Sequence, residues 1–436
     1  MNKPVLLLMA PVQTVSGYGA RSRDLANALI NMDKFDVKIW GTRWGNTPMN
    51  ALKPEVENHK AILDRMLAEP KLNAQPEVFV QVTVPNEFQQ IGKYNIGVTA
   101  GIETTVASAP WIEGCNRMDL ILISSEFSKK VFQESVWTQY DQNTNQPIGD
   151  LKLEKPIEVL LEGVDLNKYF KTDKIENTIE EQLAAIPESF CYLFVGHWLH
   201  GDFYQDRKNV AALIKSFLEA FKNKSSQSRP ALILKTSHAD FSPIDRQTLI
   251  SKIEAIYEQT AGSNLPNVYV LHGELSDEEM NSLYNHPKIK AHVTYTKGEG
   301  FGRPLAEASL SQKPIIATNW SGHIDFLKHA ILLPGALNNV HPSAAWQDVI
   351  LQESKWFDVD LGYGTSMLRH VFETYKDHQI MAKSQATFVR KNFSFESMVA
   401  KLDEYIKKYV PEFPTHQPLV LPKLKKIELP KLKKID

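Results

Sequence analysis

Short apolar runs alternate with helical patterns along the chain, and the whole alternation occurs twice. The runs in the first half are expected to form strands at Val5–Ala10, Asp36–Gly41, Glu77–Thr83, Asn95–Ala100, Leu120–Ser124 and Ile157–Leu161. Amphipathic stretches such as Arg21–Asn31 and Pro54–Leu67 lie between them. Strands that are apolar throughout and alternate with helices are typical of a parallel sheet covered on both faces. The first half therefore predicts an α/β domain.

The second half restarts this alternation. A capping-box pattern of Ser276 and Glu279 marks the start of one of its helices. The expected strands are Cys191–Val195, Ala231–Lys235, Asn267–Leu271, Ala291–Tyr295 and Pro314–Thr318, and the expected helices are Asn209–Phe221, Ser242–Tyr257, Ser276–Tyr284 and Pro304–Ser311. Further helical patterns cover Ser366–Lys376 and Ser394–Tyr409. The second half therefore predicts another α/β domain with helices after it.

The chain has 436 residues, about three times the usual length of a single domain. We predict two Rossmann-like doubly wound domains that face an interdomain cleft, because sheets of this kind bind ligands at the carboxyl ends of their strands. The N-terminal domain is expected to span residues 1–170, a polar linker 171–189 and the C-terminal domain 190–392. A helix is expected at 393–410, followed by a flexible basic tail at 411–436.

The composition excludes several classes of protein. Hydrophobic residues make up 43% of the chain and charged residues 23%, which excludes a disordered chain or a collagen-like repeat. The two cysteines, Cys115 and Cys191, favour a reducing compartment, so we expect a cytoplasmic protein. Val5–Ala10 is too short for a signal sequence or a membrane span, and no transmembrane segment is expected.

The tail repeats the peptide LPKLKKI at 421–427 and again at 429–435. Leu421–Asp436 carries a net charge of +4, which leaves −6 on the rest of the chain. Pro422 and Pro430 oppose one continuous helix, and the apolar spacing is not that of a strand. The tail is expected either to bind a docking partner or an anionic surface such as lipid or nucleic acid, or to act only as a flexible solubilising segment.

The strongest chemical motif is the segment Lys297-Gly-Glu-Gly-Phe-Gly-Arg-Pro-Leu-Ala-Glu307, between an expected strand and an expected helix. Its glycines and the helix N-terminus favour a phosphate site. Glu299 and Glu307 flank that site, and ionised carboxylates are good acceptors for sugar or ribose hydroxyls. The alternative is a strand–turn–helix corner whose acidic residues are merely solvated.

Two other motifs favour bound anions. Arg207 and Lys208 directly precede an expected helix, and cations at a helix start are disfavoured unless an anion lies between them. A solvated basic pair is the alternative. Gly17 and Gly19 belong to Ser16–Ser22, expected as a glycine-rich anion-binding turn after the first strand. A dinucleotide-binding site is the rival interpretation, but it lacks a third glycine and a clear acidic residue after the second strand.

The spacing from Glu299 to Glu307 resembles the E-x7-E motif of retaining glycosyltransferases of the GT-B fold, in particular family 4. The resemblance continues through Pro314–Thr318, Ser321-Gly322 and Asp325, and upstream through Asn267–Glu274 and Ser276–Tyr284, so that it covers most of residues 190–330. Asp325 stands where the family usually has Glu, and Ser321-Gly322 where it has Gly-Gly. The GT-B fold is the architecture that the resemblance implies.

The resemblance also implies roles for particular residues. Glu299 would contact the donor sugar, Glu307 the ribose, and Lys208 the diphosphate. His197 stands where the family often has Arg, so Arg207 is expected to substitute for that residue. Glu103, in Gly101–Thr105, is a further catalytic candidate that would contact sugar or acceptor, although an acidic loop residue is the alternative. Other expected donor-binding residues are Gly300, Phe301, Gly302, Arg303, Gly273, Gly322, His323, Gly17 and Gly19.

The function expected from the resemblance is transfer of a sugar from a nucleoside-diphosphate sugar to an acceptor hydroxyl with retention. The first domain would be the acceptor side, and the helix at 393–410 would return to it. The attack would be front-face, without a covalent intermediate, a metal or a cofactor. The acceptor stays open between glycan, lipid, protein and modified DNA base. The alternative enzymes are a phosphorylase and an epimerase. The alternative without catalysis is a nucleotide-sugar-binding or scaffold protein with a partner-docking tail.

Overall fold

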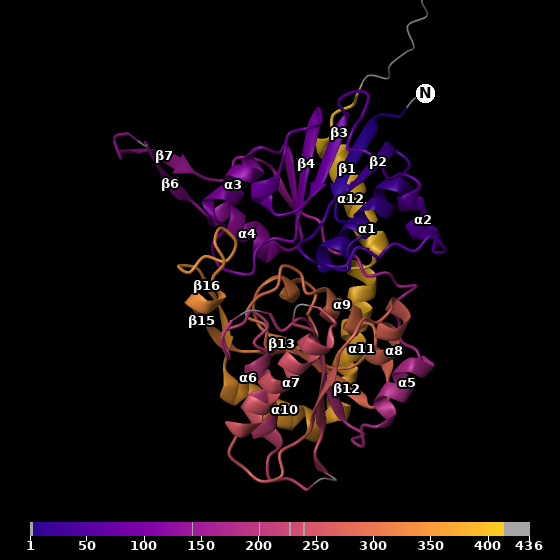
Figure 1. The fold of residues 1–436 in the computed structure, drawn as a ribbon, viewed down its shortest axis with the longest axis vertical. Helices are drawn as coiled ribbons and strands as arrows, with labels where there is room; N and C mark the ends of the chain where they lie inside the picture. Colours follow the sequence, from indigo (N-terminus) through magenta and orange to yellow (C-terminus); the bar gives the residue numbers. More distant parts are fainter. Residues whose placement is uncertain (1–2, 142, 200, 226–227, 239, 414–436) are drawn as a thin grey trace, which may run out of the picture.

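The computed structural model describes residues 3–413 except 142, 200, 226–227 and 239. The repeat tail at 421–436 lies outside the described residues. The molecule has two lobes, one above the other along its long axis (Figure 1). Among the described helices, none combines the length and the apolar character that crossing a membrane requires.

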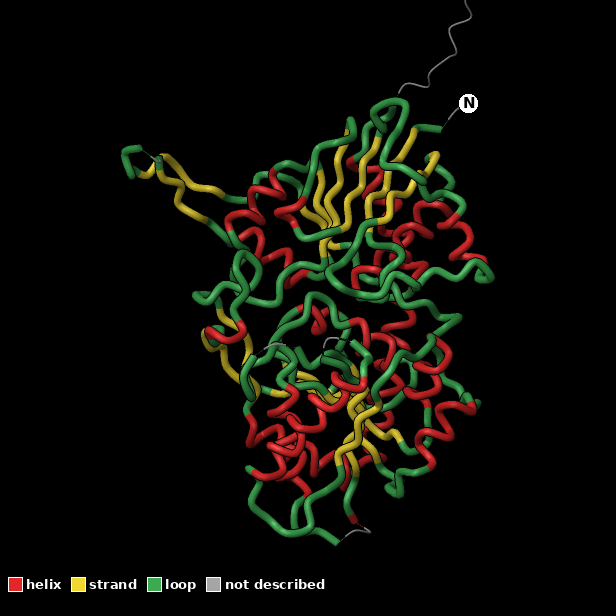
Figure 2. Tube along the Cα trace, in the orientation of Figure 1, coloured by secondary structure: helices red, strands yellow, loops and turns green. Residues whose placement is uncertain are grey.

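The N-terminal lobe is built on a sheet of six parallel strands in the order β2-β1-β3-β4-β5-β8. The strands are β1 (Val5–Ala10), β2 (Asp36–Gly41), β3 (Val78–Val82), β4 (Tyr94–Thr99), β5 (Leu120–Ile123) and β8 (Ile157–Val159). The helices of this lobe are α1 (Gly17–Asn31), α2 (Glu57–Leu63), α3 (Ala109–Asn116) and α4 (Glu126–Glu134), and they flank the sheet (Figure 2). The expected α/β domain is confirmed.

The C-terminal lobe repeats this plan with the strand order β11-β10-β9-β12-β13-β14, again all parallel. Its strands are β9 (Cys191–Val195), β10 (Ala231–Lys235), β11 (Val268–Leu271), β12 (Ile289–Val293), β13 (Ile315–Thr318) and β14 (Ile331–Leu333). This is the order of the dinucleotide-binding doubly wound fold, which reverses between β9 and β12. A cleft for ligands is expected at that reversal.

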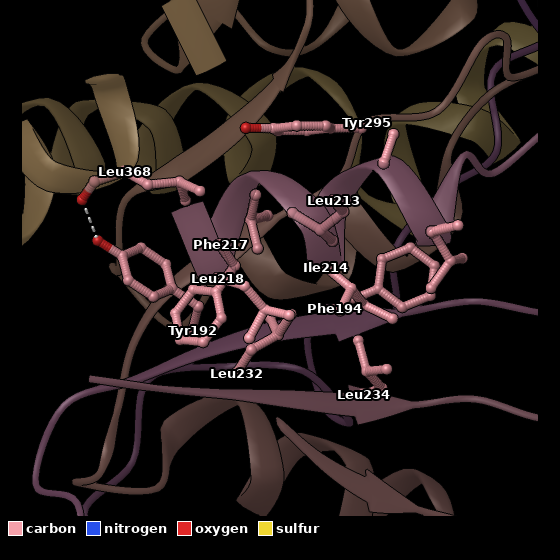
Figure 3. Close-up of a cluster of buried hydrophobic side chains, with 14 of the residues drawn as sticks. Tyr192, Phe194, Leu213, Ile214, Phe217, Leu218, Leu232, Leu234, Tyr295 and Leu368 are labelled. Carbon is pink, nitrogen blue, oxygen red and sulfur yellow. Dashed lines mark hydrogen bonds between the residues drawn. The ribbon is translucent and has the colours of Figure 1, made fainter. Parts of the chain in front are cut away.

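The helices of the C-terminal lobe bury apolar side chains against its sheet. Figure 3 shows α6 (Val210–Phe221) placing Leu213, Ile214 and Phe217 over Tyr192 and Phe194 of β9. The remaining helices are α5 (Asn177–Ala184), α7 (Pro243–Glu258), α8 (Asp277–Asn285), α9 (Arg303–Ser309), α10 (Leu361–Glu373) and α11 (Tyr375–Asn392). The range expected as a linker, 171–189, contains α5, which buries Ile179 and Leu183.

The last helix, α12 (Phe395–Tyr409), packs against the N-terminal lobe (Figure 1). Its buried Leu402 and Ile406 share one apolar core with Leu6 and Val80 of that sheet. The Tyr405 hydroxyl also donates to the Val159 carbonyl at 2.9 Å. The chain therefore completes its first lobe with its last helix.

Two hairpins stand apart from the central sheets. One pairs β6 (Trp137–Tyr140) with β7 (Pro147–Leu151) and projects from the N-terminal lobe (Figures 1 and 2). The other pairs β15 (Gly335–Asn339) with β16 (Lys355–Val359), at the side of the C-terminal lobe (Figure 1). Neither hairpin shows the continuous apolar pattern of the central strands.

Candidate active site

The loop between β12 and α9 carries Glu299, and helix α9 begins directly after this loop. Gly302 is the N-cap of α9 with φ of +97°, a left-handed conformation that glycine adopts at no steric cost. Pro304 occupies the first turn of the helix, as the sequence predicts. The Ser321 hydroxyl accepts a hydrogen bond from the Glu299 amide at 2.9 Å, and the Gly322 amide donates to the Glu299 carbonyl at 2.9 Å. These bonds fix the backbone of Glu299.

The glycines of this loop lie against the backbone of the other lobe. A methyl group on Gly298 would be 2.2 Å from the Glu103 carbonyl oxygen, and one on Gly300 would be 2.4 Å from the Ala100 carbonyl oxygen. Both distances are far below van der Waals contact. The motif is therefore also a close-packed interdomain contact, a role that its sequence alone did not indicate.

Glu299 lies between the two cations at the start of α6. The Lys208 Nζ atom is 2.5 Å from Glu299 Oε1, and Arg207 Nη1 is 3.3 Å from Glu299 Oε2. Burial alone would raise the pKa of Glu299, but Lys208 and Arg207 hold it at about 2. Arg207 also lies 3.5 Å from Glu103 Oε1 of the N-terminal lobe. All four expected catalytic residues therefore meet, at the reversal point of the C-terminal sheet.

Glu307 forms a second ionic cluster on α9. The Arg303 Nε atom donates to Glu307 Oε1 at 2.8 Å, while its Nη1 atom donates to Asp24 of α1 at 2.6 Å. The Tyr284 hydroxyl also lies 3.4 Å from Glu307. Burial raises the pKa of Glu307 to about 7, although Arg303 opposes the rise. Arg303 thus connects the expected ribose-binding carboxylate with the opposite lobe.

His323 is buried beneath the loop. Its Nε2 atom is 2.7 Å from the Thr318 carbonyl, which can only accept, so Nε2 carries the proton. Burial lowers the pKa of His323, which keeps the ring neutral. Gly302 packs over this residue, because a methyl group there would be 3.0 Å from the His323 Cβ. His323 therefore packs against the loop that carries Glu299.

The other expected donor-binding residues have different surroundings. Phe301 is 3% exposed and packs among Phe326 and Phe393, so its side chain belongs to the core. His197 follows β9, with its Nδ1 atom 2.9 Å from the Ser237 hydroxyl. The Gly273 carbonyl, after β11, accepts a hydrogen bond from Lys235 at 2.5 Å.

The segment Ser16–Ser22 was expected as a turn before the first helix, and the structure corrects its conformation: helix α1 already begins at Gly17. Gly17 and Gly19 lie in the first turn of α1, and Ser16 caps it by accepting a hydrogen bond from the Gly19 amide at 2.9 Å. Gly19 is needed for packing, because a methyl group there would be 2.1 Å from the Thr14 carbonyl oxygen. Gly17 has no such neighbour.

Sequence reasoning missed three charged residues around these clusters. Asp24 on α1 pairs with Arg303. Lys235 ends β10, and burial lowers its pKa to about 8. Lys297 is 2% exposed and forms an ion pair with Asp358. A charged residue at the end of an apolar strand was the available signal for Lys235, whereas the pairing of Asp24 depends on how the lobes meet.

Metal-binding side chains do not gather anywhere in the described part of the chain. No group of three or more His, Cys, Asp or Glu residues there has the arrangement that could hold an ion. The cationic side chains paired with Glu299 and Glu307 are those of Arg207, Lys208 and Arg303.

The chain was compared with known proteins. No protein-family profile matches it, and no curated protein sequence does. Solved structures do match: that of Anabaena Alr3699/HepE with UDP and glucose has a TM-score of 0.61 and 13% identity, over 93% of this chain and 100% of that one. Sucrose-phosphate synthase from Thermosynechococcus elongatus has a TM-score of 0.62 and 12% identity, over 93% of this chain and 99% of that one.

A third similar structure is the trehalose-6-phosphate synthase OtsA, with a TM-score of 0.58 and 10% identity, over 94% of this chain and 100% of that one. The likeness in each case extends over both lobes. Together with the two facing parallel sheets, these similarities show that the chain has the GT-B fold, as its motifs predicted.

Proposed function

We propose that this protein is a retaining glycosyltransferase that moves a sugar from a nucleoside-diphosphate sugar to an acceptor hydroxyl. The observation that carries the proposal is the meeting of Glu299, Lys208 and Arg207 at the reversal point of the C-terminal sheet, with Glu103 facing them from the other lobe. Glu307 lies eight positions after Glu299, where a nucleotide ribose would be held. The structure of Alr3699/HepE with UDP-glucose supports a nucleotide-sugar donor by analogy of fold.

In the proposed reaction, the bond between the sugar carbon and the diphosphate breaks while negative charge grows on the leaving phosphate. Lys208 and Arg207 would stabilise that charge from fixed positions, which is preorganised electrostatic catalysis. When the diphosphate binds, Lys208 and Arg207 would lose part of their interaction with Glu299 and would contact phosphate oxygens instead. Glu299 would then accept hydrogen bonds from sugar hydroxyls and orient the ring.

Retention and metal independence are parts of this proposal. The acceptor hydroxyl would attack on the face that the leaving diphosphate departs from, and a phosphate oxygen would take its proton. Glu299 is suited to positioning rather than nucleophilic attack, because two cations compensate its charge. Since those same cations can compensate the diphosphate, we propose that the reaction needs no divalent ion or other cofactor.

The setting of the reaction is also proposed. Cys115 and Cys191 are both free and buried, which supports a reducing, cytoplasmic location. The N-terminal lobe would bind the acceptor, because the donor-binding clusters belong mainly to the C-terminal lobe. The proposed domain boundaries stay at residues 170 and 189, with the packed helix α5 between them.

The test is release of nucleoside diphosphate from UDP-, GDP- and ADP-glucose, with EDTA present, across glycan, lipid, peptide and DNA acceptors. Turnover is expected with at least one donor, and the anomeric configuration of the product should equal that of the donor. Glu299→Gln and Lys208→Ala should abolish transfer while circular dichroism still reports a folded protein. Nucleotide binding without turnover in wild type would instead indicate a non-catalytic binding protein.

A further inference from the structure

The segment 335–359, here called the clasp, reaches from the C-terminal lobe to the N-terminal one. It consists of β15, β16 and the loop between them. The Ser108 hydroxyl donates to the Asp348 carbonyl of the clasp at 2.8 Å. Val349 of the clasp packs against a buried apolar cluster of the N-terminal lobe that includes Trp111 and Ile112. The clasp is therefore an interdomain contact in addition to the packing of α12 on the N-terminal lobe.

The clasp also forms a reciprocal pair of hydrogen bonds with Thr105. The Thr105 amide donates to the Lys355 carbonyl at 2.9 Å, and the Lys355 amide donates to the Thr105 hydroxyl at 2.9 Å. Thr105 lies only two residues after Glu103, in the loop that follows β4. This pair of bonds therefore restrains the loop that presents Glu103 to Arg207.

The same strand, β16, is also bonded to the donor-side loop. The Phe357 amide donates to the Lys297 carbonyl at 3.0 Å, and the Lys297 side chain forms its ion pair with Asp358. The Lys297 amide in turn donates to the Arg207 carbonyl at 2.7 Å. Strand β16 therefore bonds directly to the segments that carry Glu103 and Glu299, and it is connected to Arg207 through Lys297.

We propose that the clasp sets the position of Glu103 relative to Arg207, and that Thr105 is the positioning residue through which it acts. The inference rests on the proposed function, in which Glu103 contacts the sugar or the acceptor. Thr105 itself touches no reacting atom. If the clasp only held the lobes together, loss of one of its side-chain bonds would lower stability and leave the action of Glu103 unchanged.

The test removes the Thr105 hydroxyl, which accepts the hydrogen bond from the Lys355 amide, and keeps the size of the side chain. Thr105→Val leaves the Lys355 amide without its partner, and Thr105→Ser, the matched control, retains the hydroxyl. With the donor and acceptor found in the screen above, Thr105→Val should lower kcat about 10-fold, the scale of one lost hydrogen bond. Binding of the nucleoside diphosphate released from that donor, measured by calorimetry, should change less than about twofold. Thr105→Ser should restore most of kcat.

A double-mutant cycle separates positioning from general support. If Thr105 acts through Glu103, then Thr105→Val should cause no further loss of kcat in a Glu103→Gln background. The proposal would be overturned if the losses of kcat from Thr105→Val and Glu103→Gln multiplied in the double variant. It would also be overturned if Thr105→Val alone kept the wild-type kcat. Should Thr105→Val fail to fold, Thr105→Ala provides the same cycle.

Hydrogen exchange of the ligand-free protein supplies a readout that needs no activity. Amides in residues 101–108 should exchange faster in Thr105→Val than in wild type or Thr105→Ser, while the core strands stay protected. Unchanged exchange there would overturn the proposal. Absence of donor turnover in wild type would contradict the proposed function, whereas turnover that Thr105→Val leaves intact would contradict only the role of the clasp.

Discussion

Glu299 and Glu307 differ in charge environment although they lie only eight positions apart in one motif. Glu299 faces two cations, whereas Glu307 shares the single Arg303 with Asp24. Their spacing in the sequence predicted two carboxylates with separate ligand contacts. It could not predict that one would have a pKa of about 2 and the other of about 7, because those values depend on partners from other segments.

The raised pKa of Glu307 predicts a pH-dependent stability. Its pKa in the folded protein is about 7, above the ordinary value of 4.5, so its protonated form favours folding. That contribution is fully present below pH 4.5 and is lost as pH rises through 7. Between pH 5 and pH 8, the free energy of unfolding of wild type should fall by about 2 kcal/mol relative to Glu307→Gln. Urea unfolding of both proteins at several pH values measures this difference.

The opposite slope, or no difference between the two proteins, would show that Glu307 is ionised throughout this range. A parallel titration of Glu299→Gln is a useful comparison. The Glu299 carboxyl titrates near pH 2, so this variant should show no relative change between pH 5 and pH 8.

Gly298 offers a test of the close contact between the lobes. In Gly298→Ala the added methyl group would meet the backbone of Glu103, which cannot move aside as a flexible side chain could. We expect at least a 10-fold loss of kcat, because misplacement of reacting groups is costly. Steady-state kinetics measure the loss. Gly362→Ala is the control, since that glycine lies in α10, where the methyl group would meet only the Asp360 carboxylate and alanine favours a helix.

At the scale of elements, most central strands could be predicted because their apolar runs are continuous, but the three-residue edge strand β14 and helix α5 were not among the expected elements. Helix α11 was missed, since Val389 is the one larger apolar residue on a buried face that otherwise carries Ala382, Gln385 and Ala386. Gln385 is buried because it accepts a hydrogen bond from the His329 amide and donates one to the Phe326 carbonyl. A polar residue that tertiary hydrogen bonds bury in this way interrupts the apolar periodicity from which a helix is predicted.

The capping box of α8 was predicted from two residues and is confirmed. The Ser276 hydroxyl accepts a hydrogen bond from the Glu279 amide at 3.2 Å, and the Glu279 carboxylate accepts one from the Ser276 amide at 2.9 Å. Ser276→Ala should therefore cost about 1 kcal/mol of stability, and Ser276→Asp, which can still cap the helix, much less. Equal losses in the two variants, measured by urea unfolding, would contradict a capping role.

At the scale of the whole molecule, two facing lobes followed from the repeated alternation and the length of the chain. The return of α12 to the first lobe was also expected, but the side-chain contacts between the lobes were not. Asp24 with Arg303, Glu103 with Arg207, and Thr105 with Lys355 join residues that are 90 or more positions apart. Nothing in the local pattern of either partner identifies the other. The site could thus be predicted as two half-sites, but not as one connected network.

The basic tail leads to a prediction about the whole chain. Because the tail follows the last core helix, deletion of residues 418–436 should leave folding and transfer to a small acceptor within about twofold of wild type. A changed preference for a large or surface-bound acceptor is the expected effect. Loss of folding, monitored by circular dichroism, would show that the tail belongs to the folded body.

The packing of α12 on the first sheet has a consequence for synthesis on the ribosome. The strands of the N-terminal lobe leave the ribosome early, yet the helix that covers Leu6 and Val80 is made last. At about 5–20 residues per second, the intervening chain takes on the order of tens of seconds to translate. During that interval the nascent lobe exposes an apolar face, so premature termination before residue 395 should yield aggregation-prone fragments that depend on chaperones.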